Sequence, residues 1–335
     1  TKVSISKTDI TTGEEIEGAK LQILDKDGNV VEEWVSGKEH LIEYLPTGEY
    51  VLHEEQAPTE QGYVRAEDVT FVVEETGEIQ KVEMKDDYTK VSISKTDITD
   101  GKEVQGAKLQ IFDKDGKVVE EWTSGEEHLI EYLPTGEYTL HEEAAVDGYV
   151  VANDVAFTVK ETGEIQKVEM KDERVMGVLK IHKTDGETGD NLEGVEFTLY
   201  EKESGKEVAS FVTDKDGNAE SGQLPIGVYE NGAFKESTVY VLKETKALDG
   251  YQASEEEWEI TFKYKDDQTP VIEVLKEIQN EKAPVTTTTG APQTGDDTNW
   301  IFPVMGLLAG GICLAAVLII HKRNARRALH RRRRM

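Results

Sequence analysis

Hydrophobic and polar side chains alternate in short runs along most of the chain. KVSIS (2–6), AKLQIL (19–24) and VTFVV (69–73) are examples, and Asp-Gly, Thr-Gly or Asn-Gly pairs separate such runs. Alternation with a period of two predicts half-buried strands, and a turn about every ten residues is typical of antiparallel β-sandwiches. No segment before residue 298 keeps the 3.6-residue period of an amphipathic helix, so the pattern predicts an all-β fold.

The alternating pattern occurs three times along the chain. Residues 1–88 and 89–174 are close copies, and a diverged third copy runs over residues 175–282. The third copy inserts YENGAFKESTVY (229–240) where the other two pass directly into a strand. We therefore expect three sandwich domains in tandem, followed by an extended linker at 283–297 that is rich in Thr and Pro.

The C-terminal part of the chain has a different composition. Residues 298–320 contain no charged side chain, and about twenty of them in a helix would cross the roughly 30 Å core of a bilayer. Residues 321–335 carry eight Lys and Arg and no acid. Because such basic clusters stay on the cytoplasmic side, we expect one transmembrane helix with the repeats outside the cell.

A short motif stands immediately before this apolar segment. Together with the apolar segment and the basic tail, it resembles the cell-wall sorting signal of Gram-positive bacteria. The resemblance implies that a sortase cleaves after Thr294 and joins the Thr294 carbonyl to an amine of peptidoglycan, so that the membrane span is transient. The first position differs from the Leu of the commonest form, which leaves the sortase class open. The motif consists of Ala291, Pro292, Gln293, Thr294 and Gly295.

The charge and cysteine content narrow the classes of function. The chain has 68 Asp and Glu against 38 Lys and Arg, and residues 1–320 alone hold 30 basic and 68 acidic groups, a net charge of −38. Such an acidic body repels nucleic acid. The single cysteine, Cys313, lies in the apolar segment, so the repeats form no disulfides. No N-terminal signal peptide is visible, and we expect the sequence to derive from a longer secreted precursor.

Three polar residues of each copy fall on the apolar face of their strands. In the first strand, for example, Val3 and Ile5 share a face with Lys7. One such lysine would turn its ammonium group to water, but several buried ions cost several kcal/mol each unless they are well paired. An amide formed between the amine and the carboxyl group would remove both charges. The inward residues are Lys7, Glu54 and Asp86; Lys95, Glu142 and Asp172; and Lys183, Glu244 and Asn280.

The repeats resemble Cna protein B-type (SpaA-like) domains of Gram-positive pilins and adhesins. The motifs are SKTD or HKTD in the first strand and a later segment such as YVLKETKALDGY (240–251). The resemblance implies a prealbumin-like, Ig-like sandwich in which the first-strand lysine forms a spontaneous isopeptide bond with the last-strand Asp or Asn, assisted by the Glu. In the first two copies Glu55 and Glu143 are alternatives to Glu54 and Glu142, although the alternation favours the latter.

These features favour a structural protein and not an enzyme, since bond formation occurs once per domain. The loop Asp25-Lys26-Asp27-Gly28-Asn29 lacks the full spacing of a calcium site and is interpreted as a hairpin turn, so no metal or cofactor is expected. We expect a wall-anchored stalk that displays an upstream region, with sortase and peptidoglycan as partners. A sortase-polymerised pilin subunit, or repeats that bind a host matrix ligand, are the alternatives.

Overall fold

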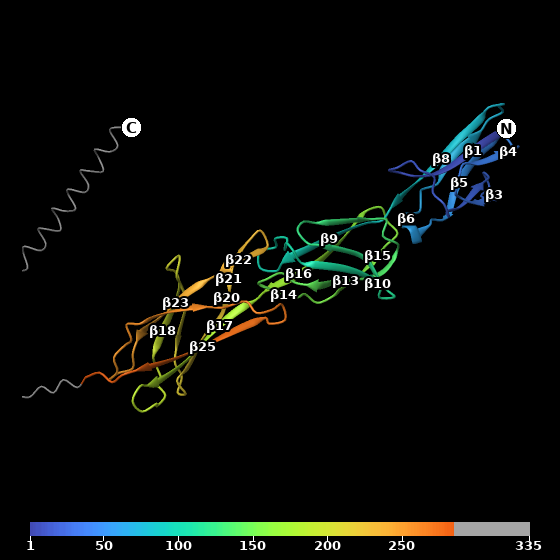
Figure 1. Cartoon of the computed structure of the whole chain (residues 1–335). Helices are drawn as coiled ribbons and strands as arrows, with labels where there is room; N and C mark the ends of the chain where they lie inside the picture. Colours follow the sequence, from blue (N-terminus) through green and yellow to red (C-terminus); the bar gives the residue numbers. More distant parts are fainter. Residues whose placement is uncertain (285–335) are drawn as a thin grey trace, which may run out of the picture. The chain divides into compact units, whose positions relative to one another are not determined.

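Every regular element of the described chain is a β-strand, apart from one short 3₁₀ helix. The computed structural model describes residues 1–284, shown in colour in Figure 1. The prediction of an all-β fold is confirmed for this part. No helix within residues 1–284 is long and apolar enough to cross a membrane. The predicted span at 298–320, the basic tail and the sorting motif lie outside the described residues.

The first repeat consists of two four-stranded sheets. One sheet has the strand order β4-β1-β8-β6 and the other has the order β3-β2-β5-β7. The elements are β1 (Lys2–Asp9), β2 (Lys20–Leu24), β3 (Val30–Val35), β4 (His40–Glu43), β5 (Gly48–Gln56), the 3₁₀ helix η1 (Thr59–Gln61), β6 (Tyr63–Val64), β7 (Val69–Val73) and β8 (Ile79–Tyr88).

The second repeat has the same two sheets, as its sequence similarity to the first predicts. Their strand orders are β12-β9-β16-β14 and β11-β10-β13-β15. The strands are β9 (Lys90–Asp97), β10 (Lys108–Asp113), β11 (Val118–Thr123), β12 (His128–Glu131), β13 (Gly136–Ala144), β14 (Tyr149–Val150), β15 (Val155–Val159) and β16 (Ile165–Arg174).

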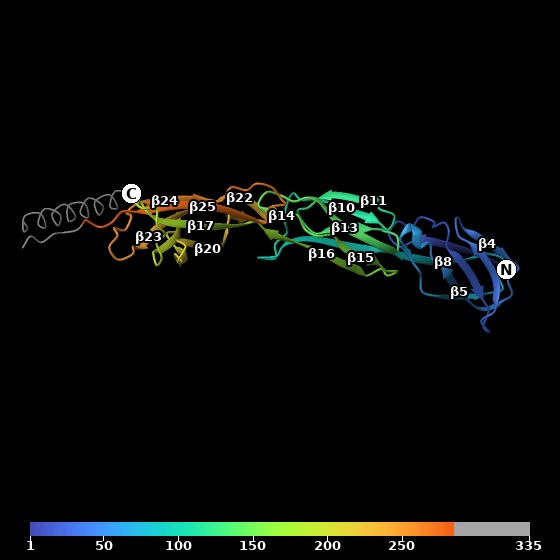
Figure 2. The ribbon, with the colours of Figure 1, turned by 90° about the horizontal axis from the view of Figure 1, so that it is seen from below.

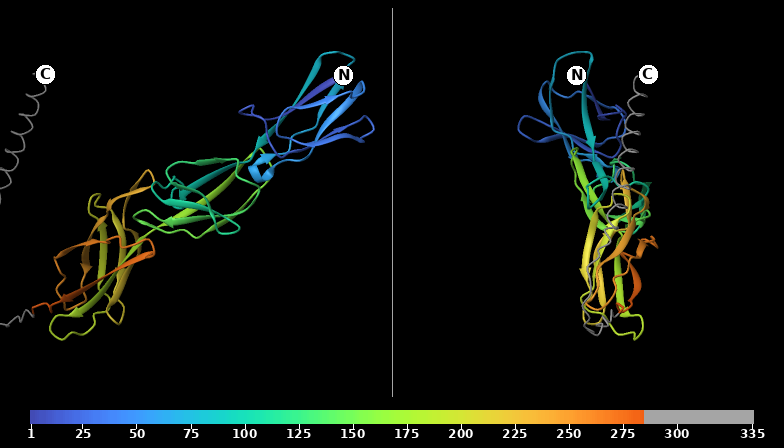
Figure 3. Two further views of the ribbon diagram at one scale, coloured as in Figure 1. Left: turned by 45° about the vertical axis from the view of Figure 1, so that its right-hand side comes forward. Right: turned by 90° about the vertical axis from the view of Figure 1, so that its left-hand side faces the viewer.

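The third repeat keeps the two layers and adds a hairpin. Its sheets have the orders β20-β17-β25 and β19-β18-β23-β24, and the inserted segment forms the separate hairpin β21-β22. The strands are β17 (Met176–Asp185), β18 (Glu196–Glu201), β19 (Glu207–Val212), β20 (Asn218–Pro225), β21 (Gly227–Glu230), β22 (Ala233–Ser237), β23 (Val239–Lys246), β24 (Glu257–Thr261) and β25 (Val271–Asn280). Figure 3 shows the three sandwiches in blue, green and yellow to orange.

Each repeat has its own hydrophobic core between its two sheets. In the first repeat, Val3 and Ile5 of β1 pack with Leu21 of β2, Leu52 of β5 and Met84 of β8, and all five side chains are buried. In β2, β5 and β8 the buried residues alternate with more exposed positions, which is why a period of two in the sequence forms one face of a sheet. The three separate cores confirm three tandem sandwiches.

The first and last strands of each repeat are parallel neighbours in one sheet. In the first repeat, β1 pairs with β8 so that Lys7 lies beside Met84 and Asp9 beside Asp86. The pairs β9 with β16 and β17 with β25 repeat this arrangement, and the last pair is visible in Figure 2. Side chains two positions apart in a strand share a face, so this register places Lys7 and Asp86 on the same face, one step apart diagonally.

Candidate cross-linking sites

The predicted inward residues of the first repeat meet in one buried cluster. Lys7 of β1, Glu54 of β5 and Asp86 of β8 are 1%, 0% and 0% exposed. The Lys7 Nζ atom donates to Glu54 Oε2 at 2.8 Å and also contacts Asp86 Oδ1. The cluster therefore joins both sheets, since Glu54 comes from the sheet opposite the other two residues. Glu55, the alternative to Glu54, is exposed.

The second repeat has an equivalent cluster. Lys95 Nζ lies 2.8 Å from Glu142 Oε2 and contacts Asp172 Oδ1, and all three side chains are buried. A backbone amide also donates to the same glutamate oxygen: Ala152 N–H to Glu142 Oε2 at 2.6 Å. In the first repeat, Ala66 N–H donates to Glu54 Oε2 at 2.7 Å. The glutamate is thus held in place by the backbone, a contact that the sequence pattern did not indicate.

The third repeat has an amide in place of the second carboxylate. Lys183 Nζ donates to Asn280 Oδ1 at 2.5 Å, and the Asn280 side-chain amide donates to Glu244 Oε1 at 2.6 Å. Lys183 Nζ lies 3.3 Å from Glu244 Oε2. The glutamate therefore contacts both the amine and the nitrogen of the Asn280 amide, which is the group that would leave in a reaction at this carbonyl.

Burial shifts the pKa of Asp86, Asp172 and Lys183 in the direction that favours their neutral forms. Burial raises the pKa of Asp86 to about 7, against the opposing effect of Lys7, and nearby Glu54 raises it further. The pKa of Asp172 is raised to about 7 for the same main reason. Burial lowers the pKa of Lys183, although Glu244 opposes the shift. Desolvation disfavours the charged form, so the two aspartates become neutral acids near neutral pH and Lys183 loses its proton more readily than a lysine in water.

Several oxygens of the clusters have no hydrogen-bond partner among residues 1–284. Leaving such a buried polar atom unpaired costs about 1–3 kcal/mol. One oxygen of each Asp is among them, and this is the atom that would be lost as water if the Asp formed an amide. The atoms without a hydrogen bond are Glu54 Oε1, Asp86 Oδ2, Glu142 Oε1, Asp172 Oδ2 and Glu244 Oε2, the last of which still lies within ion-pair distance of Lys183 Nζ.

The loop that resembles part of a calcium site is a turn stabilised by its own aspartate. Asp25 Oδ1 accepts hydrogen bonds from the backbone N–H groups of Asp27 and Asn29, both at 2.9 Å. Gly28 has φ of +81°, which a residue without Cβ adopts readily. Within residues 1–284, no three His, Cys, Asp or Glu side chains are grouped so that they could hold a metal ion.

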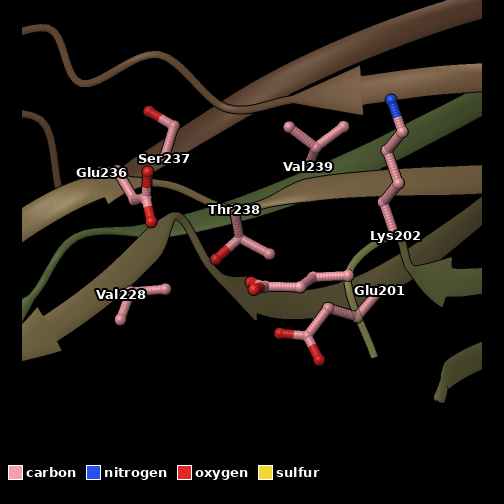
Figure 4. A pocket seen from close by; sticks show the side chains of 8 residues that line it. Glu201, Lys202, Val228, Glu236, Ser237, Thr238 and Val239 are labelled. Carbon is pink, nitrogen blue, oxygen red and sulfur yellow. The ribbon is translucent and has the colours of Figure 1, made fainter. Parts of the chain in front are cut away.

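A surface hollow of about 450 Å³ lies in the third repeat, beside the inserted hairpin (Figure 4). Glu201 and Lys202 line one side, and Glu236 and Thr238 line the other. Lys202 forms an ion pair with Glu259 of β24. The hollow thus presents ordinary surface side chains, and the buried clusters are the better candidates for chemistry.

Comparison with known proteins relates all three repeats to one family. The sequence profile of the SpaA prealbumin-like fold domain matches residues 1–88, 89–174 and 177–278. No curated protein matches the chain. A solved structure, the Bacillus anthracis TIE protein, is 30% identical with a TM-score of 0.55, and the match covers 84% of this chain and 51% of that one. The chain thus spans about half the length of that structure.

A second solved structure is a pilin. BcpA, the major pilin subunit of Bacillus cereus, is 18% identical with a TM-score of 0.47, and the match covers 84% of this chain and 99% of that one. A likeness at this level carries no argument about function.

Proposed function

Because the chain belongs to the family of SpaA prealbumin-like fold domains, we propose that it is a surface stalk whose repeats are locked internally by isopeptide bonds. The observation that carries the proposal is the buried contact of a lysine amine with a carboxyl or amide group in every repeat. In each case a glutamate lies beside the amine. Proximity of this kind supplies much of the rate of an intramolecular reaction.

In the first repeat, the reaction condenses the Lys7 amine with the Asp86 carboxyl group. A proton first passes from the ammonium group to the carboxylate, which is feasible because burial raises the pKa of Asp86 to about 7. The neutral Nζ atom then attacks Cγ of Asp86, the bond from Cγ to the hydroxyl oxygen breaks, and water leaves. Glu54 accepts the proton that Nζ loses and returns one to the departing oxygen. The product is a neutral secondary amide.

In the third repeat, the same attack on Cγ of Asn280 breaks the bond from Cγ to the amide nitrogen. The leaving group departs as ammonia after Glu244 has passed to it the proton that Lys183 lost. Glu244 is suited to this transfer because it contacts both nitrogens. Each repeat reacts once, so this is maturation of the protein and not turnover of a substrate.

The bond would stabilise a repeat mainly by restricting the unfolded chain. Lys7 and Asp86 are 79 residues apart, and the chain-entropy estimate for closing such a loop is about 4.5 kcal/mol. The bond also joins the first strand to the last, so tension on a repeat would pass through covalent bonds without separating β1 from β8. Resistance to pulling suits a stalk that has no disulfides.

Peptide mapping tests the chemistry with two adjacent glutamates as a matched pair. In the chain of residues 1–283, digestion should yield a branched peptide that links Lys7 to Asp86. We expect Glu54→Gln to abolish this peptide and Glu55→Gln, at the exposed neighbouring position, to leave it unchanged. Equal yields of the branched peptide from both variants would contradict the role of Glu54.

We further propose that the chain is anchored to the peptidoglycan of a Gram-positive cell by a sortase that acts at Thr294. The support is the order of the sequence features: the motif Ala291-Pro292-Gln293-Thr294-Gly295, the apolar residues 298–320 and the basic tail. In a Gram-positive host, the protein should be released only by digestion of the wall. Thr294→Ala should move it to the membrane fraction, whereas Thr286→Ala should not. Ladders of high-mass species in wall digests would instead favour the pilin alternative.

A further inference from the structure

One tyrosine of the second repeat connects it to the first repeat. The Tyr132 hydroxyl donates to Asp9 Oδ2 at 2.8 Å. Its ring stacks on Tyr88, with centroids 4.0 Å apart, and meets Tyr63 edge-on at 5.6 Å and 76°. Burial beside Asp9 raises the pKa of the Tyr132 phenol, so the phenol remains a donor over the physiological range. Tyr132 is therefore the centre of this junction.

The backbones of the two repeats also approach closely at this junction. A Cβ atom on Gly62 would lie 2.3 Å from the Tyr132 carbonyl carbon, and the φ of Gly62 is +82°. The Thr135 N–H group donates to Thr59 O at 3.3 Å, and the Tyr88 hydroxyl donates to Glu131 Oε1 at 3.1 Å. Only glycine permits this approach. We call Asp9, Gly62, Tyr63 and Tyr88 the base of repeat 1.

The second junction also centres on a tyrosine, which comes from a different element. Tyr229, in the hairpin that only the third repeat has, meets Tyr149 edge-on at 5.2 Å and 74°. Its hydroxyl donates to Gly148 O at 2.7 Å, and Arg174 lies 4.2 Å from its ring centroid. Arg174 Nε also donates to Asp97 Oδ2 at 2.6 Å. In both junctions, an aromatic ring of the following repeat thus packs against a Gly-Tyr pair of the preceding repeat.

Tyr44 of the first repeat corresponds to Tyr132 and has no such neighbour in residues 1–284. Its side chain is 85% exposed. Its φ is +67°, close to the +60° of Tyr132, and both values are unusual for a bulky residue. An equivalent backbone hydrogen bond holds the loop of each tyrosine. The Tyr44 N–H group donates to Thr1 O at 3.0 Å, and the Tyr132 N–H group donates to Thr89 O at the same distance. The loop therefore keeps its docking conformation by itself.

Three further residues of the second repeat contact the first repeat, and the first repeat has residues at the corresponding positions. Glu131 accepts from Tyr88, Thr135 donates to Thr59, and Glu161 accepts from the Arg65 N–H group. Their counterparts are identical residues. These counterparts, Glu43, Thr47 and Glu75, form with Tyr44 what we call the top of repeat 1.

We propose that the top of repeat 1 is a docking surface for the base of another repeat of this kind, joined ahead of Thr1 in the same polypeptide. The occupant must supply an aspartate to accept from the Tyr44 hydroxyl, two tyrosine rings to pack against it and a glycine for close approach. The first junction provides the template, because Thr89-Lys90-Val91 there has the sequence of Thr1-Lys2-Val3. A preformed loop reduces the entropy lost on docking.

An extended chain tests this proposal. A second copy of residues 1–88 is joined ahead of Thr1 in the chain of residues 1–283, which reproduces the native sequence around residues 88 and 89. The added copy carries Tyr44→Phe, so that only one Tyr44 remains for mass spectrometry. Hydroxyl-radical oxidation of Tyr44 is then compared in the extended and unextended chains, and Tyr132 in the same molecule serves as the protected standard.

Extension should slow the oxidation of Tyr44 severalfold, toward the rate of Tyr132. Gly62→Val in the added copy alone should restore fast oxidation, because it blocks the close approach. The intact mass of the extended chain, which should be short by one more water than that of the unextended chain, shows that the added copy still folds. Equal oxidation of Tyr44 in the extended and unextended chains would overturn the proposal. Protection that grows with concentration in the unextended chain would overturn it too, since it would assign the surface to contacts between molecules.

Discussion

The substitution Glu54→Gln tests how much the cross-link of the first repeat contributes to stability. The change keeps the size of a side chain that is fully buried but removes its carboxylate, and with it both the relay of protons and the ion pair with Lys7. Without the bond, the unfolded repeat regains the entropy of an open 79-residue loop, which is worth about 4.5 kcal/mol. At 4–8 °C per kcal/mol for a domain of this size, the melting temperature of repeat 1 should fall by roughly 18–36 °C.

Calorimetry of the chain of residues 1–283 measures this shift with internal standards. Each repeat has its own core, so the transitions of repeats 2 and 3 should stay in place while that of repeat 1 moves down. Glu55→Gln is the control for a surface change and should shift the melting temperature by a few degrees at most. The account is refuted if Glu54→Gln eliminates the bond and repeat 1 still melts at its original temperature.

Three further changes have defined outcomes. Asp86→Asn should preserve the bond of repeat 1 but release ammonia in place of water, as intact mass would show. Lys7→Met removes the isopeptide bond of repeat 1, whereas burial continues to hold the pKa of Asp86 above its ordinary value of 3.8. Because Lys7 lowers this pKa in the native protein, its removal raises the pKa further. A pKa raised on folding gives stability that is present below pH 4 and lost as the pH rises toward the raised pKa, so urea midpoints of this variant should fall from about pH 4 upward. Tyr132→Phe removes the donor to Asp9 and should weaken the first junction by about 1.5–3 kcal/mol, seen as faster oxidation of Tyr63.

The sequence pattern predicted which face of its sheet each cluster residue occupies, but it did not predict which of these residues lie beside one another. A period of two was enough to predict that Lys7, Glu54 and Asp86 face inward, because it reports the side of the sheet on which each residue lies. It cannot report which strands are neighbours. That Lys7 and Asp86 meet depends on the parallel pairing of β1 with β8, and only the family resemblance anticipated that meeting.

The alternation of hydrophobic and polar residues could not predict the contacts between repeats. Tyr132 stands in a turn where the sequence shows no period, and its left-handed φ is not indicated by its residue type. The hairpin of β21 and β22 was visible only as an insertion. A Gly-Tyr pair about two thirds of the way along each copy was the one available sign, since Gly62 and Gly148 both lie where the next repeat approaches.

The intact mass of the chain of residues 1–283 is the most direct test of the internal cross-links. If all three bonds form, the measured mass is lower than the sequence mass by two waters, from Asp86 and Asp172, and one ammonia, from Asn280. Lys7→Ala should then restore one water and leave the other two losses unchanged. A mass equal to that of the unmodified sequence, in protein that is folded and freshly purified, would contradict the account.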